Sequence, residues 1–256
     1  MNRPRIYALG LLLALFLLCG LSSARAAGED ILAQADSLYA QRIKTEKAEA
    51  ALALYRQAQA LSPDSAPAAL GLGRCLVWLA VVQENEKSST LVKEAVDVLS
   101  GSLKKDPDNP GLHYWLGTAQ GLQANEGPLT AVTVMGAMRK HLNRVIELEP
   151  GYEYGGAYRV LGRLDAKAPG LLGGDKVEAE ELLKKAISLA PAYWHNHLFL
   201  ADLYYKTDRK KEAEALLNKV LASRPQPGLE AEHQIWLKEA ELLLARLQGR
   251  ASVDRD

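Results

Sequence analysis

The residues of this chain that most often carry out chemistry are spread out rather than clustered. Its five histidines are His113, His141, His195, His197 and His233. His195 and His197 stand two residues apart, so on a helix they point to different sides, and no cysteine or carboxylate joins them at metal-ligand spacing. The sequence also lacks Gly-x-Ser-x-Gly, His-Glu-x-x-His and the dinucleotide-binding fingerprint. These patterns predict a protein that is not an enzyme and that uses no cofactor or metal.

A glycine-rich stretch over residues 168–175 has the composition of a phosphate-binding loop but not its chemistry. It lacks the Gly-Lys-Ser/Thr ending that such a loop uses to hold phosphate. Asp175 followed by Glu178 is instead typical of the start of a helix, where an acidic side chain caps free backbone N–H groups. We therefore predict a structural turn here.

The first 26 residues have the features of a secretory signal peptide. Arg3 and Arg5 precede an apolar run over residues 6–18, and Ala24-Arg25-Ala26 offers a small-x-small cleavage site. The run is shorter than the ~20 residues of a membrane-spanning helix. We expect a cleaved signal and a periplasmic or secreted protein. A retained anchor, or lipidation at Cys19, would instead attach the chain to the membrane.

The charge of the mature chain argues against nucleic acid as a partner. Cleavage after Ala26 removes three of the 31 basic residues and none of the 31 acidic ones, which leaves a net charge of −3. A nearly neutral protein without base-reading motifs does not bind polyanions in general. One cysteine, Cys75, remains in an apolar segment. We expect a buried, inert thiol, with a reactive thiol as the alternative.

Five prolines show how the chain is organised. Pro63, Pro107, Pro150, Pro191 and Pro225 follow one another at intervals of 44, 43, 41 and 34 residues. Proline ends a helix because it lacks the N–H and restricts the residue before it. Punctuation at a nearly fixed period is typical of a repeat array.

The same residue types recur around each proline. Eight residues before it stands a large side chain: Tyr55, Leu99, Leu142, Leu183 or Leu217. Nine and ten residues after it come Leu72-Gly73, Leu116-Gly117 and Leu200-Ala201; Leu161-Gly162 falls two residues late, and Gly155-Gly156 can absorb this slip. Small residues on a helix face let a neighbouring helix approach closely. The pattern predicts one helical hairpin per proline.

These residues resemble the tetratricopeptide repeat (TPR), a helical hairpin with an aromatic-x-x-Leu-Gly first helix, an Ala-x-x-x-large second helix and a closing proline. The resemblance covers roughly residues 30 to 226. It implies an all-α fold, a right-handed TPR-like superhelix of about five hairpins. We place the array at residues 28–226, a capping helix at 229–248, because arrays need polar ends, and a disordered tail at 249–256.

Residues 140–222 resemble two exported or repeat-containing families more specifically. The order Leu-Gly, Ala-Pro-Gly, Gly-Gly-Asp, Ala-Ile and Ala-Pro-Ala-Tyr is similar to exported bacterial proteins related to the T-component of TRAP transporters. It also resembles the repeat domain of regulator-of-microtubule-dynamics proteins. The T-component resemblance implies a helical oligomer with a central cavity, although no family ligand site can be mapped onto this chain by residue.

The first helix of each hairpin is expected to line the concave side of the array. With the Leu-Gly pairs as register, the predicted partner-binding residues are Arg74, Trp78, Tyr114, Thr118, Arg159, Arg163, His195, Asp202 and Tyr205. Arginine and aromatic side chains often anchor protein and peptide contacts. The alternative is that these are ordinary surface residues or inter-repeat ion pairs. The asparagine and lysine pattern of a carboxylate clamp is absent.

Two functions fit this sequence. The first is a non-catalytic protein-interaction scaffold in the cell envelope that binds a protein or peptide partner in the concave groove. The alternative is an oligomeric solute-binding accessory component of a periplasmic TRAP-type transporter; whether the chain forms a homo-oligomer is left open. The apolar stretch 131–138 separates the two. Burial within the monomer, which a helix apolar on all sides favours, supports the scaffold. Exposure along a cavity supports the transporter component.

Overall fold

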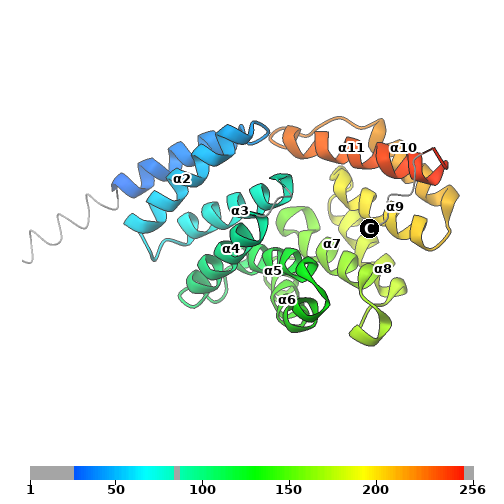
Figure 1. The fold of residues 1–256 in the computed structure, drawn as a ribbon, viewed down its shortest axis with the longest axis horizontal. Coiled ribbons are helices and arrows are strands. Elements are labelled where there is room, and N and C mark those ends of the chain that lie inside the picture. Colours follow the sequence, from blue (N-terminus) through cyan, green and yellow to red (C-terminus); the bar gives the residue numbers. More distant parts are fainter. Residues whose placement is uncertain (1–25, 84–86, 251–256) are drawn as a thin grey trace, which may run out of the picture.

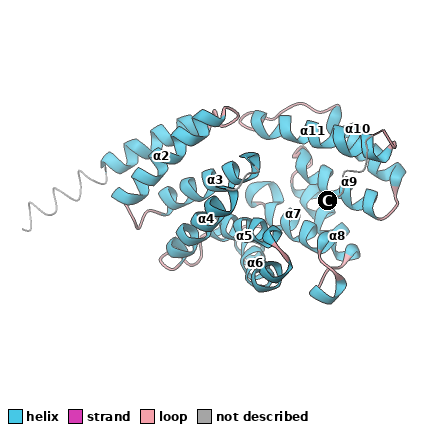
Figure 2. Ribbon diagram, viewed as in Figure 1, coloured by secondary structure: helices cyan, strands magenta, loops and turns pink. Residues whose placement is uncertain are grey.

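The computed structural model describes residues 26–83 and 87–250, and nearly all of this part of the chain is helical (Figures 1 and 2). The predicted signal peptide lies outside the described residues except for Ala26, and so do residues 251–256 of the predicted tail. Figure 1 shows α3, α5, α7 and α9 on the inner side of a curved array and α4, α6 and α8 outside them.

In the described part of the chain, five hairpins and a final helix follow one another. The first hairpin pairs helical residues 26–39 with α2 (Thr45–Leu61). The next four are α3 (Ala66–Gln83) with α4 (Lys87–Leu103), α5 (Pro110–Gln123) with α6 (Pro128–Leu148), α7 (Tyr152–Lys167) with α8 (Lys176–Leu189), and α9 (Trp194–Lys206) with α10 (Lys210–Leu221). Helix α11 (Glu230–Leu247) completes the array, and two short 3₁₀ turns, η1 (Ala124–Glu126) and η2 (Gly170–Leu172), lie between helices. The predicted all-α, TPR-like solenoid is confirmed.

The recurring glycines and leucines meet within each hairpin. A Cβ atom built on Gly73 would lie 2.6 Å from the Leu99 side chain, and one on Gly117 would lie 2.9 Å from Leu142. Gly162 repeats the contact, 2.8 Å from Leu183 in the next hairpin. The missing side chain therefore lets the two helices of each hairpin touch, as the spacing predicted.

The helix starts follow the expected capping chemistry. The Asn109 side chain accepts a hydrogen bond from the Leu112 N–H at 3.1 Å, with Pro110 in the first turn. Asp175 caps α8 by accepting from the N–H groups of Val177 and Glu178. The glycine-rich stretch before it is a turn that includes η2, as predicted.

The start of α7 absorbs the two-residue slip in the repeat. Glu153, Tyr154 and Gly155 have φ angles of 48°, 61° and 73°, so three consecutive residues adopt the left-handed conformation. Each non-glycine residue held this way costs of the order of 1–3 kcal/mol. The Glu153 carbonyl accepts from Arg159 at 3.2 Å and the Tyr154 carbonyl from Asn196 at 3.1 Å, so these contacts hold the turn.

The prediction that the stretch 131–138 is buried on all sides is wrong for half of its residues. Met135 and Met138 are buried, but Val132 is 55% exposed and Leu129, one turn earlier, is 86% exposed. Gly136 and Ala137 also face outwards. The stretch is apolar all round because its inner half packs on the array while its outer half forms an apolar surface on α6.

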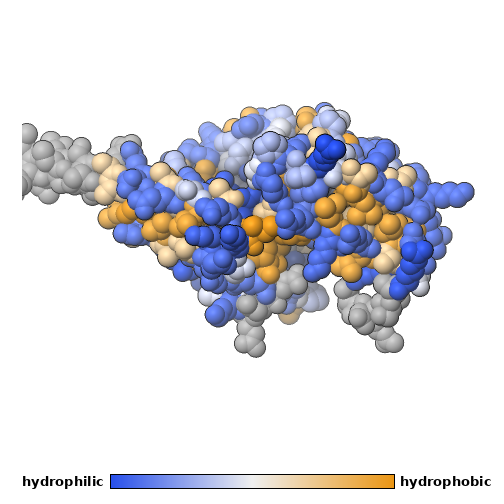
Figure 3. Space-filling view, turned by 90° about the horizontal axis from the view of Figure 1, so that it is seen from above, coloured by the Kyte–Doolittle hydropathy of each residue, from blue (hydrophilic) through white to orange (hydrophobic). Residues whose placement is uncertain are grey.

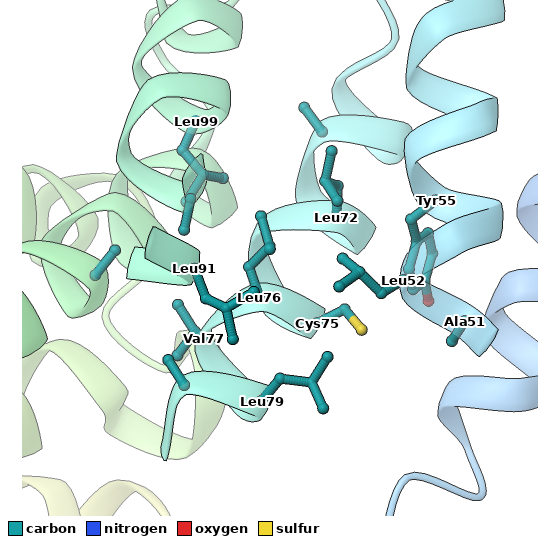
Figure 4. Packing of buried hydrophobic residues seen from close by; sticks show 14 of the residues in the cluster. Ala51, Leu52, Tyr55, Leu72, Cys75, Leu76, Val77, Leu79, Leu91 and Leu99 are labelled. Atoms are coloured by element: carbon teal, nitrogen blue, oxygen red, sulfur yellow. The ribbon is translucent and has the colours of Figure 1, made fainter. Parts of the chain in front are cut away.

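The core runs between the hairpins. Figure 4 shows Cys75, Leu76 and Leu79 of α3 between apolar side chains of α2 and α4. Cys75 is fully buried, as predicted, and burial raises the pKa of its thiol to about 12. Helix α3 is the one described helix long and apolar enough to cross a membrane, but 56% of that window is buried inside the array, as in a core helix.

A candidate binding surface on the inner face of the array

The two ends of the array meet through one arginine. Arg42, in the turn before α2, donates from Nε at 2.9 Å and from Nη2 at 2.5 and 2.6 Å to the Glu232 carboxylate on α11. Its Nη2 also donates to the Gly228 carbonyl at 3.0 Å. Figure 1 shows this turn beside the start of α11. We call the junction of Arg42 with Gly228 and Glu232 the seam. It closes the curve of the array into a ring.

Two arginines lie over an aromatic ring beside the seam. The guanidinium carbons of Arg42 and Arg74 lie 4.9 and 4.5 Å from the Tyr39 ring centroid. Trp78, one turn after Arg74 on α3, donates from Nε1 to the Arg42 carbonyl at 3.3 Å. Arg74 makes only long contacts to Asp36, at 3.4 Å, and Tyr55, and its buried Nε has no hydrogen-bond partner. Arg74 therefore keeps donors for a ligand.

Arg159 on α7 joins three hairpins. Its Nη2 donates to the Tyr114 hydroxyl at 2.7 Å and its Nη1 to the Asn196 side chain at 3.1 Å. Its guanidinium also lies over the Tyr193 ring, 4.7 Å from the centroid. The side chain is almost completely buried, and both of its Nη atoms donate to partners within the array. Arg159 is consequently a structural tie rather than a free anchor.

Rings from three helices continue the inner face toward α11. Tyr154 stacks on Tyr193 with centroids 4.5 Å apart, and Tyr193 meets Trp236 edge-on at 4.8 Å. His195 also stacks on Trp236, with ring centroids 5.5 Å apart. Burial first, and then the nearby arginines, lower the pKa of His195 well below its ordinary value. This histidine is therefore neutral and acts as part of an aromatic wall.

Glu153, at the start of α7, is an acidic residue whose carboxyl is influenced by several arginines of this face. Burial raises the pKa of its carboxyl, and the positive charges of Arg159, Arg74 and Arg42 partly oppose that rise. Side chains from the first, second and fourth hairpins thus act on one carboxylate. We call the set Tyr39, Arg42, Arg74, Tyr114, Glu153, Arg159, Tyr193, His195, Glu232 and Trp236 the inner-face network.

The structure brings most of the predicted residues into or beside this network. Arg74, Tyr114, Arg159 and His195 belong to it, and Trp78 adjoins Arg42. Arg163 lies over Phe199, with its Nη1 3.5 Å from the Asp202 carboxylate. The remaining two are Thr118, which donates to the Tyr114 carbonyl, and Tyr205, which packs partly buried against the core of the last hairpins.

Sequence reasoning missed the residues outside the Leu-Gly register. Tyr39 and Arg42 precede the first such pair, and Glu232 and Trp236 follow the last, so the register could not assign them to a face. Glu153 lies in the irregular turn. Tyr193 could have been predicted from the sequence, because the Ala-Pro-Ala-Tyr segment marks the start of the first helix of a hairpin.

The other histidines have structural roles. His113 and His197 each stand six residues after a repeat proline and donate from Nε2 to that proline's carbonyl, at 2.9 and 2.8 Å. The Nδ1 atoms of His113 and His141 lie 2.9 Å apart, within hydrogen-bond distance. His233 contacts Ser223. Among the described residues, no three side chains of the metal-binding types gather into a cluster.

Comparison with known proteins gives one family. The family model described as TRAP transporter T-component matches residues 10–249. No curated protein matches the chain.

Solved structures show the same fold at low sequence identity. A thermophilic TPR protein of Thermus thermophilus superposes with a TM-score of 0.65 and 22% identity, over 84% of this chain and 99% of that one. The Pseudomonas aeruginosa pilF protein gives 0.54 and 19%, covering 91% and 95%. A tetratricopeptide repeat protein of Parabacteroides merdae gives 0.53 and 17%, covering 93% and 88%. These likenesses establish the TPR fold.

Proposed function

The chain belongs to the TRAP transporter T-component family, and we propose its function from that starting point. The protein is a non-catalytic accessory component of a TRAP-type transporter in the cell envelope, and it binds a solute on the inner face of its array. The family favours a transporter role over a free-standing scaffold. The T-component resemblance of the sequence and the closed inner face point to the same role.

The main support for this proposal is that Arg74 has N–H donors without short hydrogen bonds. Arg42 and Arg159 have short hydrogen bonds, but the buried Nε of the partly exposed Arg74 side chain has no partner and its Nη2 contacts are 3.4 and 3.5 Å long. A buried donor without a partner is costly, so such a group is commonly satisfied when a ligand binds. An anionic group on the solute would accept hydrogen bonds from Arg74, and the surrounding aromatic rings would pack against an apolar part of the same solute.

Native mass spectrometry of the mature protein, purified gently from its own host, tests the proposal. We expect a small non-protein mass on the wild-type protein that is absent from Arg74→Met. Arg56→Met is the matched control, because Arg56 joins α2 to Glu94 on α4 in an exposed ion pair. Retention of the mass by Arg74→Met would contradict an inner-face site.

A protein-interaction scaffold is the second candidate, and one observation favours it. The outer face of α6 exposes Leu129 and Val132, and Leu171 in η2 is fully exposed. Exposed large apolar side chains of this kind are typical of protein contacts. Purification of the protein with a protein partner, lost on Leu129→Ser/Val132→Ser, would support a scaffold that uses its outer surface.

A further inference from the structure

A cavity of about 280 Å³ lies at the seam, where the first and last parts of the array face each other. One wall comes from the turn before α2 and from α3, with Ile43, Trp78 and Val82. The other wall is α11, with Gln234, Ile235 and Lys238. Pockets for drug-sized molecules span about 300–1,000 Å³, so this volume suits a molecule of one or two rings.

The lining of the cavity is apolar with a positive edge. None of its lining residues is acidic. The charge of Arg42 is taken up by Glu232. Lys238 is exposed, and among the described residues it has no hydrogen-bond or ion-pair partner. A ligand that fits these walls has an apolar body and one negative charge.

We propose that the seam cavity binds a small apolar anion, with its rings between Trp78 and Ile235 and its anionic group at Lys238. This site is distinct from the Arg74 site on the inner face and does not depend on the proposed function. Cationic side chains recognise carboxylates through charge-assisted hydrogen bonds, which are stronger than neutral ones. The apolar walls supply the burial that a charged group alone lacks.

A ligand at this position also couples to closure of the ring. Its two walls lie far apart in the sequence, on α3 with the preceding turn and on α11, and α11 otherwise packs on α9 and α10. A molecule that contacts both walls binds the closed array better than the open one. Binding therefore shifts the population toward the closed form.

A matched pair of probes tests the site by calorimetry on the mature protein. We expect 2-naphthoate to bind and the uncharged 2-naphthamide to bind about two- to fivefold more weakly, the factor that one solvent-exposed ion pair supplies. Lys238→Gln should reduce naphthoate binding to the level of the amide. Lys185→Gln, an exposed lysine on α8, is the control and should leave binding unchanged.

Hydrogen exchange with and without naphthoate locates the probe. Protection in residues 39–45 and 230–238 is expected and would confirm binding across the seam. Equal affinity for acid and amide, or no naphthoate binding, would overturn the proposal. Loss of binding in Arg74→Met but not in Lys238→Gln would also overturn it and would assign the probe to the inner face instead.

Discussion

The ion pair at the seam can be weakened without changing its shape. Glu232→Gln keeps the size of the side chain but removes the charge that receives three contacts from Arg42. The Arg42 side chain is 9% exposed and that of Glu232 20%, so solvent replaces little of the lost interaction. Hydrogen bonds to charged groups contribute about 1.5–3 kcal/mol each, with strong overlap between contacts of one pair. We expect the seam to lose about 2 kcal/mol.

A loss of this size should appear as local opening. About 2 kcal/mol corresponds to a roughly thirtyfold larger open population. Because each repeat contacts mainly its neighbours, the seam can open while the central hairpins stay folded. Hydrogen exchange read by mass spectrometry should therefore accelerate in residues 36–44 and 228–236 and stay unchanged in residues 110–148.

Arg56 and Glu94 supply the matched control. They form an ion pair of the same bidentate geometry, with contacts of 2.7 and 2.5 Å, but their side chains are 48% and 30% exposed. Exposed pairs contribute about 0–1 kcal/mol, so Glu94→Gln should have little effect. Exchange at the seam that differs less than twofold between Glu232→Gln and wild type would refute the idea that this pair holds the ring closed.

Three further predictions concern single positions. Gly117→Ala should destabilise the protein to urea by about 1–3 kcal/mol, because the new Cβ would lie 2.9 Å from Leu142, whereas Gly136→Ala, with nothing within 4 Å, should stabilise it slightly. Burial lowers the pKa of His141 from 6.5 to about 4, so the unfolded chain binds more protons and stability should fall as pH drops from about 6.5 to 4. Allowing for its half-exposed ring, the loss is about 1–2 kcal/mol, and a His141→Gln variant with the same pH slope would contradict this. Burial raises the pKa of the Cys75 thiol to about 12, so Ellman's reagent should label it only on unfolding, and rapid labelling of the native protein would show that the core opens.

The fold was predictable because its signals are local. Each proline ends a helix through its own backbone, and each glycine admits a leucine from the partner helix of the same hairpin, as Gly73 admits Leu99. Even the slip in the fourth repeat was visible in its glycine pair. The apolar stretch on α6 was misjudged because composition gives no sign of whether a further chain covers its outer side.

The site was less predictable because it depends on how tightly the array curls. The repeat register places Arg159 on the inner face, but only the curl brings Tyr114 and Asn196 from adjacent hairpins onto its guanidinium. Arg159, which was expected to anchor a partner in the groove, is therefore a buried side chain that links three hairpins. Arg42 and Glu232 are 190 residues apart, and no local pattern relates them.

Because the ring is closed, the two candidate functions would use different surfaces of the array. A peptide partner in the groove would need an open inner face with free anchors, but both Nη atoms of Arg159 donate within the array and the seam joins the ends. A small solute needs no such opening, and Arg74 still offers donors. A protein partner would instead meet the outer face, where Leu129 on α6 is exposed. If the chain acts as the proposed transporter component, substitutions at Arg74 and at Leu129 should impair separate steps, solute binding at the former and assembly with a protein partner at the latter.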